Sequence, residues 1–445
     1  MTSSLAEVSV ELPQINGSFT GSRSLTLAGC VNMALDRNPD ILRAKSEIQK
    51  TTGLIVEAKS AAIPKITTNG IIQWQDADRL EGADIEPYYW DVGIRAREPI
   101  YSGGQIISSI QEAKFTEQAA LLSLQNTIDQ TILNVRQAFN AILLNRSLII
   151  VASQNVDLLT EEVHDQESRL KAGTVTNFNV LRAEVDLANA RPTLIHARNN
   201  LRIALAQLAK LLSIPDSGSF EQPSFDIQGE LPAGTFDHKY EEALSTALAQ
   251  RSDFKALESR YQASKQQVKV AQSGYQPELD AYVGYDDISS SLYSFGHQLH
   301  GGIAGVEGSW NIFDGQLTKG RVEEARAGVQ TAIINIDDAR HQVELDVRQA
   351  YSAVIEAQEF IESQKKNVES ATESLRLARA RFDAGAGTQL DVLDSNVALT
   401  TARTNELQSR ADFNNAVAQL ERAMGIITTF QGAKSQALKN SQIQH

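Results

Sequence analysis

Two copies of one pattern run through the 445 residues of this chain, at an offset of about 212 residues. The stretch ALDRNPDILRA, which begins at Ala34, matches ALAQRSDFKAL, which begins at Ala247. Further on, RLKAGTVTNFNVLRAEVDLANAR from Arg169 matches RFDAGAGTQLDVLDSNVALTTAR from Arg381. Matches this far apart and in the same order indicate a duplicated unit of roughly 200 residues rather than a short solenoid repeat. We therefore expect two internal structural repeats in a pseudo-symmetric molecule.

Composition excludes several classes of function. The net charge of −14 argues against a nucleic-acid partner, since phosphate binding needs clustered Lys and Arg. A single cysteine leaves no intrachain disulfide and no Cys-based zinc site. The HxxH pair His297 and His300 lies in a Ser/Gly-rich loop, where we expect no ligand site. Because no nucleophile–base pair, phosphate-binding glycine loop or metal set is evident, the sequence predicts no enzyme activity, no cofactor and no metal.

The N-terminal region bears on targeting. No apolar run approaches the ~20 residues of a membrane-spanning helix, and about the first 25 residues lack the basic start and apolar core of a signal peptide. The protein is therefore intracellular, or this is a mature form without its leader. Leu27 to Cys30 fits a bacterial lipobox, but the residues before it are polar. We expect Cys30 instead to pack, as a small buried thiol, on a first short helix.

A seven-residue hydrophobic period is present in each half. In the first half it consists of Leu121, Ile128, Val135, Ile142, Ile149, Val156, Val163 and Leu170. In the second half it consists of Val347, Val354, Ile361, Val368, Leu375 and Phe382. A strict period of seven favours coiled-coil packing with a left-handed supercoil. No proline or glycine lies between Gly104 and Ala172, which predicts a helix of ~100 Å with a counterpart from about Gln316 to Asp383.

Each long helix is predicted to end at a short turn that contains glycine. The turns are Lys171-Ala172-Gly173-Thr174 and Asp383-Ala384-Gly385-Ala386-Gly387. Glycine permits the left-handed conformation that stops a helix, and a short loop makes the two flanking helices antiparallel. Returning helices are expected from about Asn177 to Leu212 and from about Gln389 to Met424. Shorter helices, from about Asp40 to Ala61 and from Asp253 to Ser273, would stack end to end with the returning ones.

Four segments with period-two alternation predict β-strands, two in each half. From Trp90 to Arg97, for example, apolar and polar residues alternate strictly. Segments of ~10 residues that carry Trp74, Trp90 and Trp310 match transmembrane β-strands with an interfacial aromatic girdle. In a soluble sandwich the same tryptophans would lie in the core. Because four strands cannot close a barrel around a lumen, a barrel requires three copies and twelve strands.

Together these features resemble the TolC-like outer-membrane efflux and secretion channels, from about Leu25 to Gly425. The specific marks are the duplication, the opening LTLAGCVNMALDRNPDI, Pro64 and Pro277 before the strands, REPIYSGGQ and GSWNIFDGQ at the strand-to-helix transitions, and the RFDAGAGTQLDVLDS turn. The resemblance implies a mainly α-helical homotrimer. A twelve-stranded barrel would lie in the outer membrane of a Gram-negative-type bacterium, surrounded by lipid. A long α-helical coiled-coil tunnel would cross the periplasm.

The expected domain organisation follows the two repeats. The first repeat covers residues 25–212, with a β-hairpin at 63–101 and a helix hairpin at 104–212. The second covers 238–425, with β-strands at 277–313 and a helix hairpin at 316–424. Residues 213–237 form an equatorial linker between them, and residues 1–24 and 426–445 form the two tails.

The resemblance also assigns residues near the periplasmic tip of the tunnel. Asp391 and Asp394 share one helix face. Matching aspartates in the family form rings at the pore constriction, where they favour cations and contribute to gating. Without the resemblance, an aspartate near a helix N-terminus is explained as well by the helix dipole.

The chain departs from the family pattern at the residues that hold the tip closed. Gly387 stands where an arginine is often found, Phe382 where a tyrosine is, and Asn179 replaces an aspartate. Arg182 is the counterpart of Asp394 in the first half. The family's closing contacts therefore do not transfer, and Asn179, Arg182 and Phe382 are candidate gate neighbours.

The implied function is a passive exit duct of a tripartite efflux or type I secretion system. An inner-membrane pump or ABC exporter would supply the energy. A periplasmic adaptor (membrane fusion) protein would dock its helical hairpin on the two turns, Lys171 to Thr174 and Ala384 to Gly387. Drug efflux and protein secretion are both open as cargo routes. The alternative from another class is a soluble coiled-coil scaffold or toxin, against which the Trp-bearing strands argue.

Overall fold

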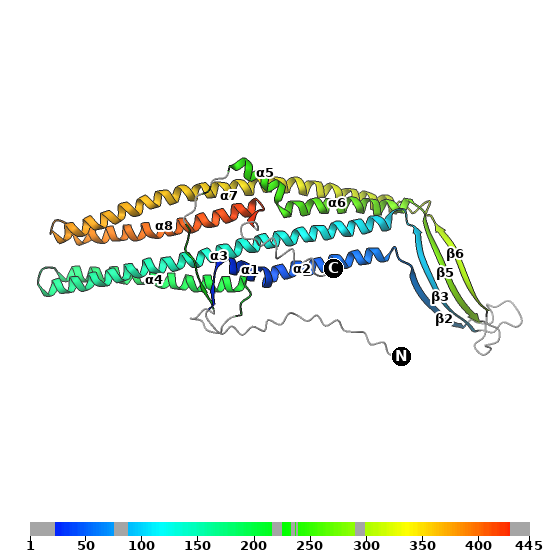
Figure 1. Ribbon diagram of the computed structural model, residues 1–445, viewed down its shortest axis with the longest axis horizontal. Coiled ribbons are helices and arrows are strands. Elements are labelled where there is room, and N and C mark those ends of the chain that lie inside the picture. Colours follow the sequence, from blue (N-terminus) through cyan, green and yellow to red (C-terminus); the bar gives the residue numbers. More distant parts are fainter. Residues whose placement is uncertain are drawn as a thin grey trace.

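The protein, described here from a computed structural model, is an elongated array of long helices that ends in a four-stranded sheet (Figure 1). The structure describes residues 23–74, 88–215, 225–232, 236, 239–289 and 299–427. Most of the two predicted tails and His297 lie outside these residues.

Two helices of 67 residues each run the length of the helical part. They are α3 (Gln105–Lys171) and α7 (Leu317–Asp383), and both begin and end within one residue of the predicted bounds. The returning helices α4 (Asn177–Leu211) and α8 (Gln389–Ala423) have 35 residues each. The helices α2 (Pro39–Ser60) and α6 (Ser252–Gln272) lie in line with α4 and α8 along the long helices (Figure 1). The predicted end-to-end stacking is therefore confirmed.

Small elements surround the middle of the helical part. Two short helices, α1 (Leu27–Arg37) and α5 (Tyr240–Gln250), pack on α3 and α7 respectively. The strand β1 (Arg23–Leu25) pairs in parallel with β4 (Phe225–Ile227), and the 3-10 turn η2 (Ser273–Tyr275) follows α6. The β1–β4 pair was not predicted, because three-residue strands are too short to show a period.

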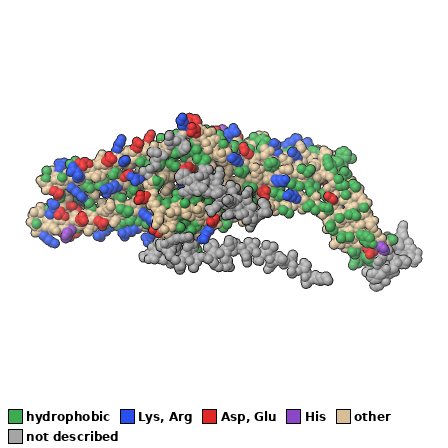
Figure 2. All heavy atoms as spheres, viewed as in Figure 1, with side chains coloured by type: hydrophobic (Ala, Val, Ile, Leu, Met, Phe, Trp, Pro, Cys, Tyr) green, Lys and Arg blue, Asp and Glu red, His purple; other side chains and the backbone are tan. Residues whose placement is uncertain are grey.

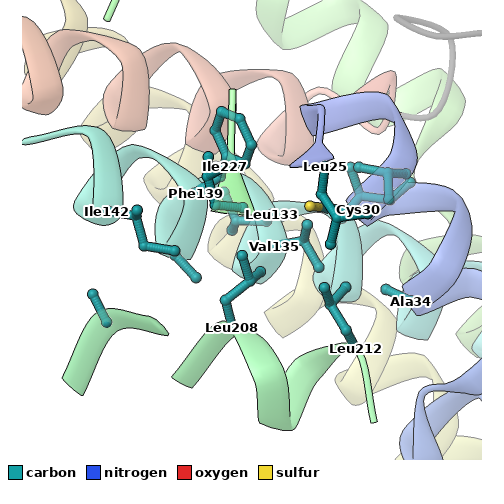
Figure 3. Close-up of a cluster of buried hydrophobic side chains, with 14 of the residues drawn as sticks. Leu25, Cys30, Ala34, Leu133, Val135, Phe139, Ile142, Leu208, Leu212 and Ile227 are labelled. Atoms are coloured by element: carbon teal, nitrogen blue, oxygen red, sulfur yellow. The ribbon is translucent and has the colours of Figure 1, made fainter. Parts of the chain in front are cut away.

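The largest apolar core lies at this middle level. Figure 3 shows side chains from α1, α3, α4 and the β1–β4 pair meeting there, among them Cys30, Val135, Phe139, Leu208 and Ile227. Full burial of a Val or Leu side chain contributes about 1.5–3 kcal/mol. Cys30 is fully buried, and this burial raises the pKa of its thiol to about 11. The predicted packing of Cys30 is confirmed, and the lipobox interpretation is not.

The seven-residue period marks the packed face of each long helix only in part. Ile128, Val135, Ile142, Val347, Val354 and Leu375 are buried. The other members are half-buried, except Leu121, which is 46% exposed. The period therefore identifies the helix face correctly but does not show which stretch of it is covered.

The expectation that no segment is apolar enough to span a membrane is corrected for α3. One stretch of this helix is long and apolar enough, by length and composition, to cross a membrane, and 22% of that stretch is buried. The apolar character has another explanation in the fold, since α3 is packed against α2, α4, α6 and α8. A helix with neighbours on both sides needs apolar residues on more than one face.

The sheet contains the four predicted strands in antiparallel order β2-β3-β5-β6. They are β2 (Lys65–Trp74), β3 (Tyr88–Tyr101), β5 (Glu278–Ser289) and β6 (Leu299–Ser309). One expectation was wrong: β6 ends at Ser309, so Trp310 lies just beyond the strand. Its indole Nε1 donates instead to the carbonyl oxygen of Tyr275 at 3.2 Å.

The sheet and the helical layer have corresponding open edges. In the sheet these edges are β2 and β6. In the helical layer α2 and α4 pack on α3 at one edge, while α7 packs on α6 and α8 at the other. Because α2 leads into β2 and β6 leads into α7, each strand edge continues into the helix edge beside it (Figure 1).

Candidate functional site: the tip and the two faces of the sheet

The two helix-joining turns at the tip have the same backbone conformation. Ala172 and Ala384 end their helices at φ −78° and −77°, and Gly173 and Gly385 follow at φ +77° and +73°. Only glycine adopts such positive φ angles without strain. The amide of Gly173 donates to the carbonyl oxygen of Leu170 at 2.9 Å, and that of Gly385 to Phe382 at 3.0 Å. The predicted turn residues Lys171–Thr174 and Ala384–Gly387 therefore form two equivalent ends.

Asp391 closes a capping box at the start of α8. Its carboxylate Oδ2 accepts from the backbone N–H of Thr388 at 2.9 Å, and its own N–H donates to the Thr388 hydroxyl oxygen at 3.2 Å. The backbone and side-chain hydrogen bonds from Thr388 lower the pKa of the exposed Asp391 carboxyl. A helix-terminus role for Asp391 is thus present, in the form of a capping box that the Thr-x-x-Asp spacing could have indicated.

The first repeat has a weaker version of the same cap. The hydroxyl of Thr176 donates to Asn179 Oδ1 at 3.0 Å, but no side chain caps a backbone N–H at the start of α4. Arg182 and Asp394 follow three residues after Asn179 and Asp391, and both are exposed. Within the described part of the chain, neither makes a hydrogen bond or ion pair.

Phe382 connects the two hairpins at the tip. The guanidinium of Arg169, which is bonded to Asp165 at 2.6 Å, lies over the Phe382 ring with 4.9 Å to the ring centroid. A cation over an aromatic face contributes about 0.5–1 kcal/mol at an exposed site. Phe382 thus joins α3 to α7. Of the three candidate gate neighbours it alone makes such a contact between hairpins in the described chain, while Asn179 bonds within its own cap.

A row of polar contacts from α3 to α8 was missed by sequence reasoning. Going from the middle of the helices toward the tip, the pairs are Arg136–Glu421, Asn140–Asn415, Asn155–Asn396 and Glu162–Gln389. The two Asn–Asn distances are 2.8 Å, and Gln389 Nε2 lies 3.1 Å from Glu162 Oε1. These contacts fix the register between the two repeats, since a shift by one residue would leave part-buried polar groups without partners.

A buried network joins the repeats where α6 begins. Arg251 donates to both carboxylate oxygens of Asp253, at 3.0 and 2.7 Å, and to Asp346 on α7 at 2.8 Å. Asp129 on α3 accepts from Gln125 Nε2 at 2.9 Å and from the Ser252 hydroxyl at 3.4 Å. Burial raises the pKa of Asp129 to about 6, since these bonds offset only part of the cost of desolvating a carboxylate.

Asp129 is expected to make the protein less stable as pH rises. Its pKa is about 6 in the folded chain against an ordinary 3.8, so the folded state binds the proton more tightly. The resulting stabilisation, about 3 kcal/mol at most, is complete below the ordinary pKa and is lost as pH rises through about 6. In the Asp129→Asn variant, the free energy of unfolding measured with denaturant should no longer show this decline between about pH 4 and 7. An exposed control on the same helix, Asp157→Asn, should keep the wild-type pH profile.

Cross-strand pairing gives the sheet two different faces. One face is mainly apolar, with Glu98, Asp287 and His300 as its ionisable members, and it includes Ile66, Thr68, Ile72, Trp74, Trp90, Val92, Ile94, Ala96, Ala281, Val283, Tyr285, Ala304 and Val306. On the other face Arg95 pairs with Asp286 at 3.2 Å, and Arg97 pairs with Asp280 at 3.4 Å and Glu307 at 3.0 Å. Residues directly opposite each other in adjacent strands share a face. The predicted alternation of a wet and an apolar face is therefore confirmed.

Apolar side chains predominate at the strand end of the molecule. Figure 2 shows few charged side chains there, whereas charged side chains of both signs are scattered along the helices. Among the described residues, no group of three or more His, Cys, Asp or Glu is placed to hold a metal ion.

Comparison with known proteins identifies the family. The model of the family "Outer membrane efflux protein" matches residues 30–213 and 243–426, one match in each repeat. The outer membrane protein TolC of Escherichia coli is 20% identical over 435 residues, covering 93% of this chain and 85% of that protein. The alkaline protease secretion protein AprF of Pseudomonas aeruginosa is 20% identical over 425 residues, covering 91% and 85%.

A solved structure has the same fold. The Campylobacter jejuni CmeC outer membrane channel superposes with a TM-score of 0.81 at 18% identity, covering 94% of this chain and 88% of that one. The chain belongs to the outer membrane efflux protein family, and the resemblance to TolC-like channels is confirmed. The protein is thus an outer-membrane exit channel that extends into the periplasm, rather than a soluble scaffold or toxin.

Proposed function

We propose that the protein is the passive exit duct of a tripartite efflux or type I secretion system and that it works as a homotrimer. One comparison between the repeats carries this proposal. On α8, Leu393 is covered by α3 and is 6% exposed, whereas its counterpart on α4, Leu181, is 52% exposed. In the same way, Asn396 on α8 is buried, whereas its counterpart Glu184 on α4 is exposed. The bare side of α4 therefore lacks a neighbour that α8 has, and the α7 edge of a second copy would supply it.

Three copies would also close the sheet. The open strands β2 and β6 lie at the corresponding edges, so β6 of one copy would pair with β2 of the next. Open strand edges invite pairing, and full closure removes them. Three copies of a four-stranded sheet give twelve strands, which is within the range of outer-membrane barrels and wide enough to enclose a lumen.

The apolar face of the barrel would contact outer-membrane lipid. Glu278 pairs with Ser309 beside Trp310, and Ser289, eleven residues further along β5, pairs with Trp90. Eleven steps span about 36 Å along the strand and, at a tilt of about 45°, about 25 Å along the membrane normal. This is close to the ~25 Å apolar band of such barrels. Trp74 and Trp90 would form the girdle at the outer surface, and Trp310 at the periplasmic one.

The tip would carry the entrance and the docking surface. Asp391 and Asp394 are proposed to line the constriction, with Asn179, Arg182 and Phe382 as neighbours. The equivalent turns Lys171–Thr174 and Ala384–Gly387 would receive the helical hairpin of a periplasmic adaptor, six turns in the trimer. An inner-membrane pump or ABC exporter would drive transport, so the duct needs neither cofactor nor catalytic residue, and no nucleic acid takes part. AprF is named for protease secretion, and both proteins and small molecules are candidate cargo for this duct.

The trimer is tested by its mass and by a pair of variants. In detergent the protein should have about three times the 48.6 kDa of the chain, after allowance for bound detergent in light scattering. Leu181→Asp, at the bare side of α4, should convert it to smaller species. Asn189→Asp, which adds the same charge about 80° around the helix, should leave the trimer intact, because its counterpart Thr401 is exposed even on the fully flanked α8. A monomer with native circular dichroism, or equal effects of the two variants, would contradict the proposal.

A further inference from the structure

We propose that Arg182 sets the charge selectivity of the duct by standing level with Asp394 and neutralising that ring of carboxylates. Asp391 alone would then give the constriction its net negative charge. This inference rests on the proposed function, in which the two aspartates line the lumen of a trimer.

Arg182 and Asp394 lie at the same distance from the start of their own helices. The outward helices have 67 residues each and the returning helices 35 each, and the turns between them share one conformation. Helix α4 begins at Asn177 and α8 at Gln389, so each of the two residues is the sixth of its helix. At 1.5 Å per residue both lie about 7.5 Å above the start of the helix.

The two residues also lie on the same helix face. On α8, Val392 and Leu399 are buried in a cluster with residues of α7, and Leu393 is buried against Leu159 of α3. Asp394 lies at the centre of the remaining face, which neither long helix covers. It is flanked there by the exposed residues Leu390, Asp391, Val397, Ala398 and Thr401.

On α4 the corresponding face is also bare. Val180 and Leu187, the counterparts of Val392 and Leu399, are buried, and Arg182 points away from them as Asp394 does on α8. The 52% exposed Leu181 marks the side that a second copy would cover. Arg182 lies about 100° around the helix from Leu181, so closing the trimer leaves it on the same face as Asp394.

The charge at each level follows from this placement. In a trimer, the Asp391 level combines three carboxylates with three neutral Asn179 side chains. The Asp394 level combines three carboxylates with three guanidiniums, which remain protonated at any working pH. The two levels together carry a net charge of about −3 instead of the −6 that six aspartates alone would give, because each Arg182 cancels one carboxylate. From the sequence alone, Arg182 was a candidate gate neighbour without an assigned effect on the charge of the constriction.

Conductance in planar bilayers tests the proposal, with reversal potentials in a KCl gradient and block by hexamminecobalt(III) as readouts. Arg182→Gln should raise cation over anion selectivity and lower the blocking concentration by about tenfold. Asp394→Asn should shift both readouts in the opposite direction, and Arg182→Lys should behave like wild type. The control Arg198→Gln, about 160° around the same helix, should change neither readout. Each variant is first checked for wild-type trimer mass, which separates selectivity from assembly.

The outcomes distinguish a failure of the inference about Arg182 from a failure of the proposed function. If Arg182→Gln trimers conduct and are blocked like wild type while Asp391→Asn changes both readouts, Arg182 lies off the lumen and the inference is wrong, although the duct stands. If neither Arg182→Gln nor Asp391→Asn changes either readout, the tip residues do not line the constriction. A wild-type trimer without conductance would overturn the proposed function and this inference with it.

Discussion

Replacing Val354 with Asp is expected to abolish assembly of the protein, and Val135→Asp should do the same from the other repeat. Both valines are fully buried between helices, Val354 on α7 and Val135 on α3. An aspartate at either place would be an unpaired charge in an apolar core, which costs about 3–5 kcal/mol even after local relaxation. The effect is measured as the yield of trimer in detergent extracts. For any trimer that is recovered, the unfolding midpoint is measured as well.

The matched control for this experiment is Thr372→Asp. Threonine is close to valine in size, Thr372 lies on α7 as Val354 does, and it is exposed. Its counterpart Thr160 is exposed too, although α3 has neighbours on both sides, so trimer closure should leave Thr372 in water. Gln137, which lies outside the seven-residue period, is a poorer control because its side chain is half-buried. Equal loss of assembly in Val354→Asp and Thr372→Asp would show that the packed face has been assigned wrongly.

The helices were predicted well because their signals are local. Glycines at 104, 173 and 385 mark helix ends, and the period of seven from Leu121 to Leu170 excludes strands over that stretch. The four strands were also found, since alternation in segments such as Trp90 to Arg97 is strict. The error at Trp310 shows where this signal fails. Alternation continues through Ile312, but the strand stops at Ser309 and the Trp310 indole bonds to Tyr275 instead.

The contacts between repeats could not be predicted, because nothing local marks them. Asn155 and Asn396 are 241 residues apart, and a single sequence gives no reason to pair them. Buried charges such as Asp129 and Arg251 look like surface residues in a polar stretch of sequence. The residues at the tip could be predicted only in part. The duplication located Asp394 and Arg182 as counterparts, but only the covered and bare faces of α4 and α8 show that they share one orientation.

The double substitution Asp391→Asn, Asp394→Asn is expected to remove block by multivalent cations while the trimer still assembles. Assembly should survive because asparagine still offers an oxygen to the Thr388 N–H and because the tip turns do not involve either carboxylate. Wild type should be cation-selective and blocked from the periplasmic side by millimolar divalent or trivalent cations, since carboxylates around a narrow lumen concentrate such ions.

The direction of the expected change in ion selectivity follows from the charges that remain at the tip. The hydrogen bonds from Thr388 lower the pKa of Asp391, which keeps its carboxylate ionised at neutral pH in wild type. In the double variant both rings of carboxylates are gone and three copies of Arg182 are left, so selectivity should reverse toward anions in the same KCl-gradient measurement. If the variant is blocked like wild type, the aspartates act only as helix-terminus residues. The constriction would then have to lie among other residues of the bare faces of α4 and α8. Val185 and Val397 would be the first residues to replace. Both are exposed, and they occupy equivalent positions less than one helical turn beyond Arg182 and Asp394.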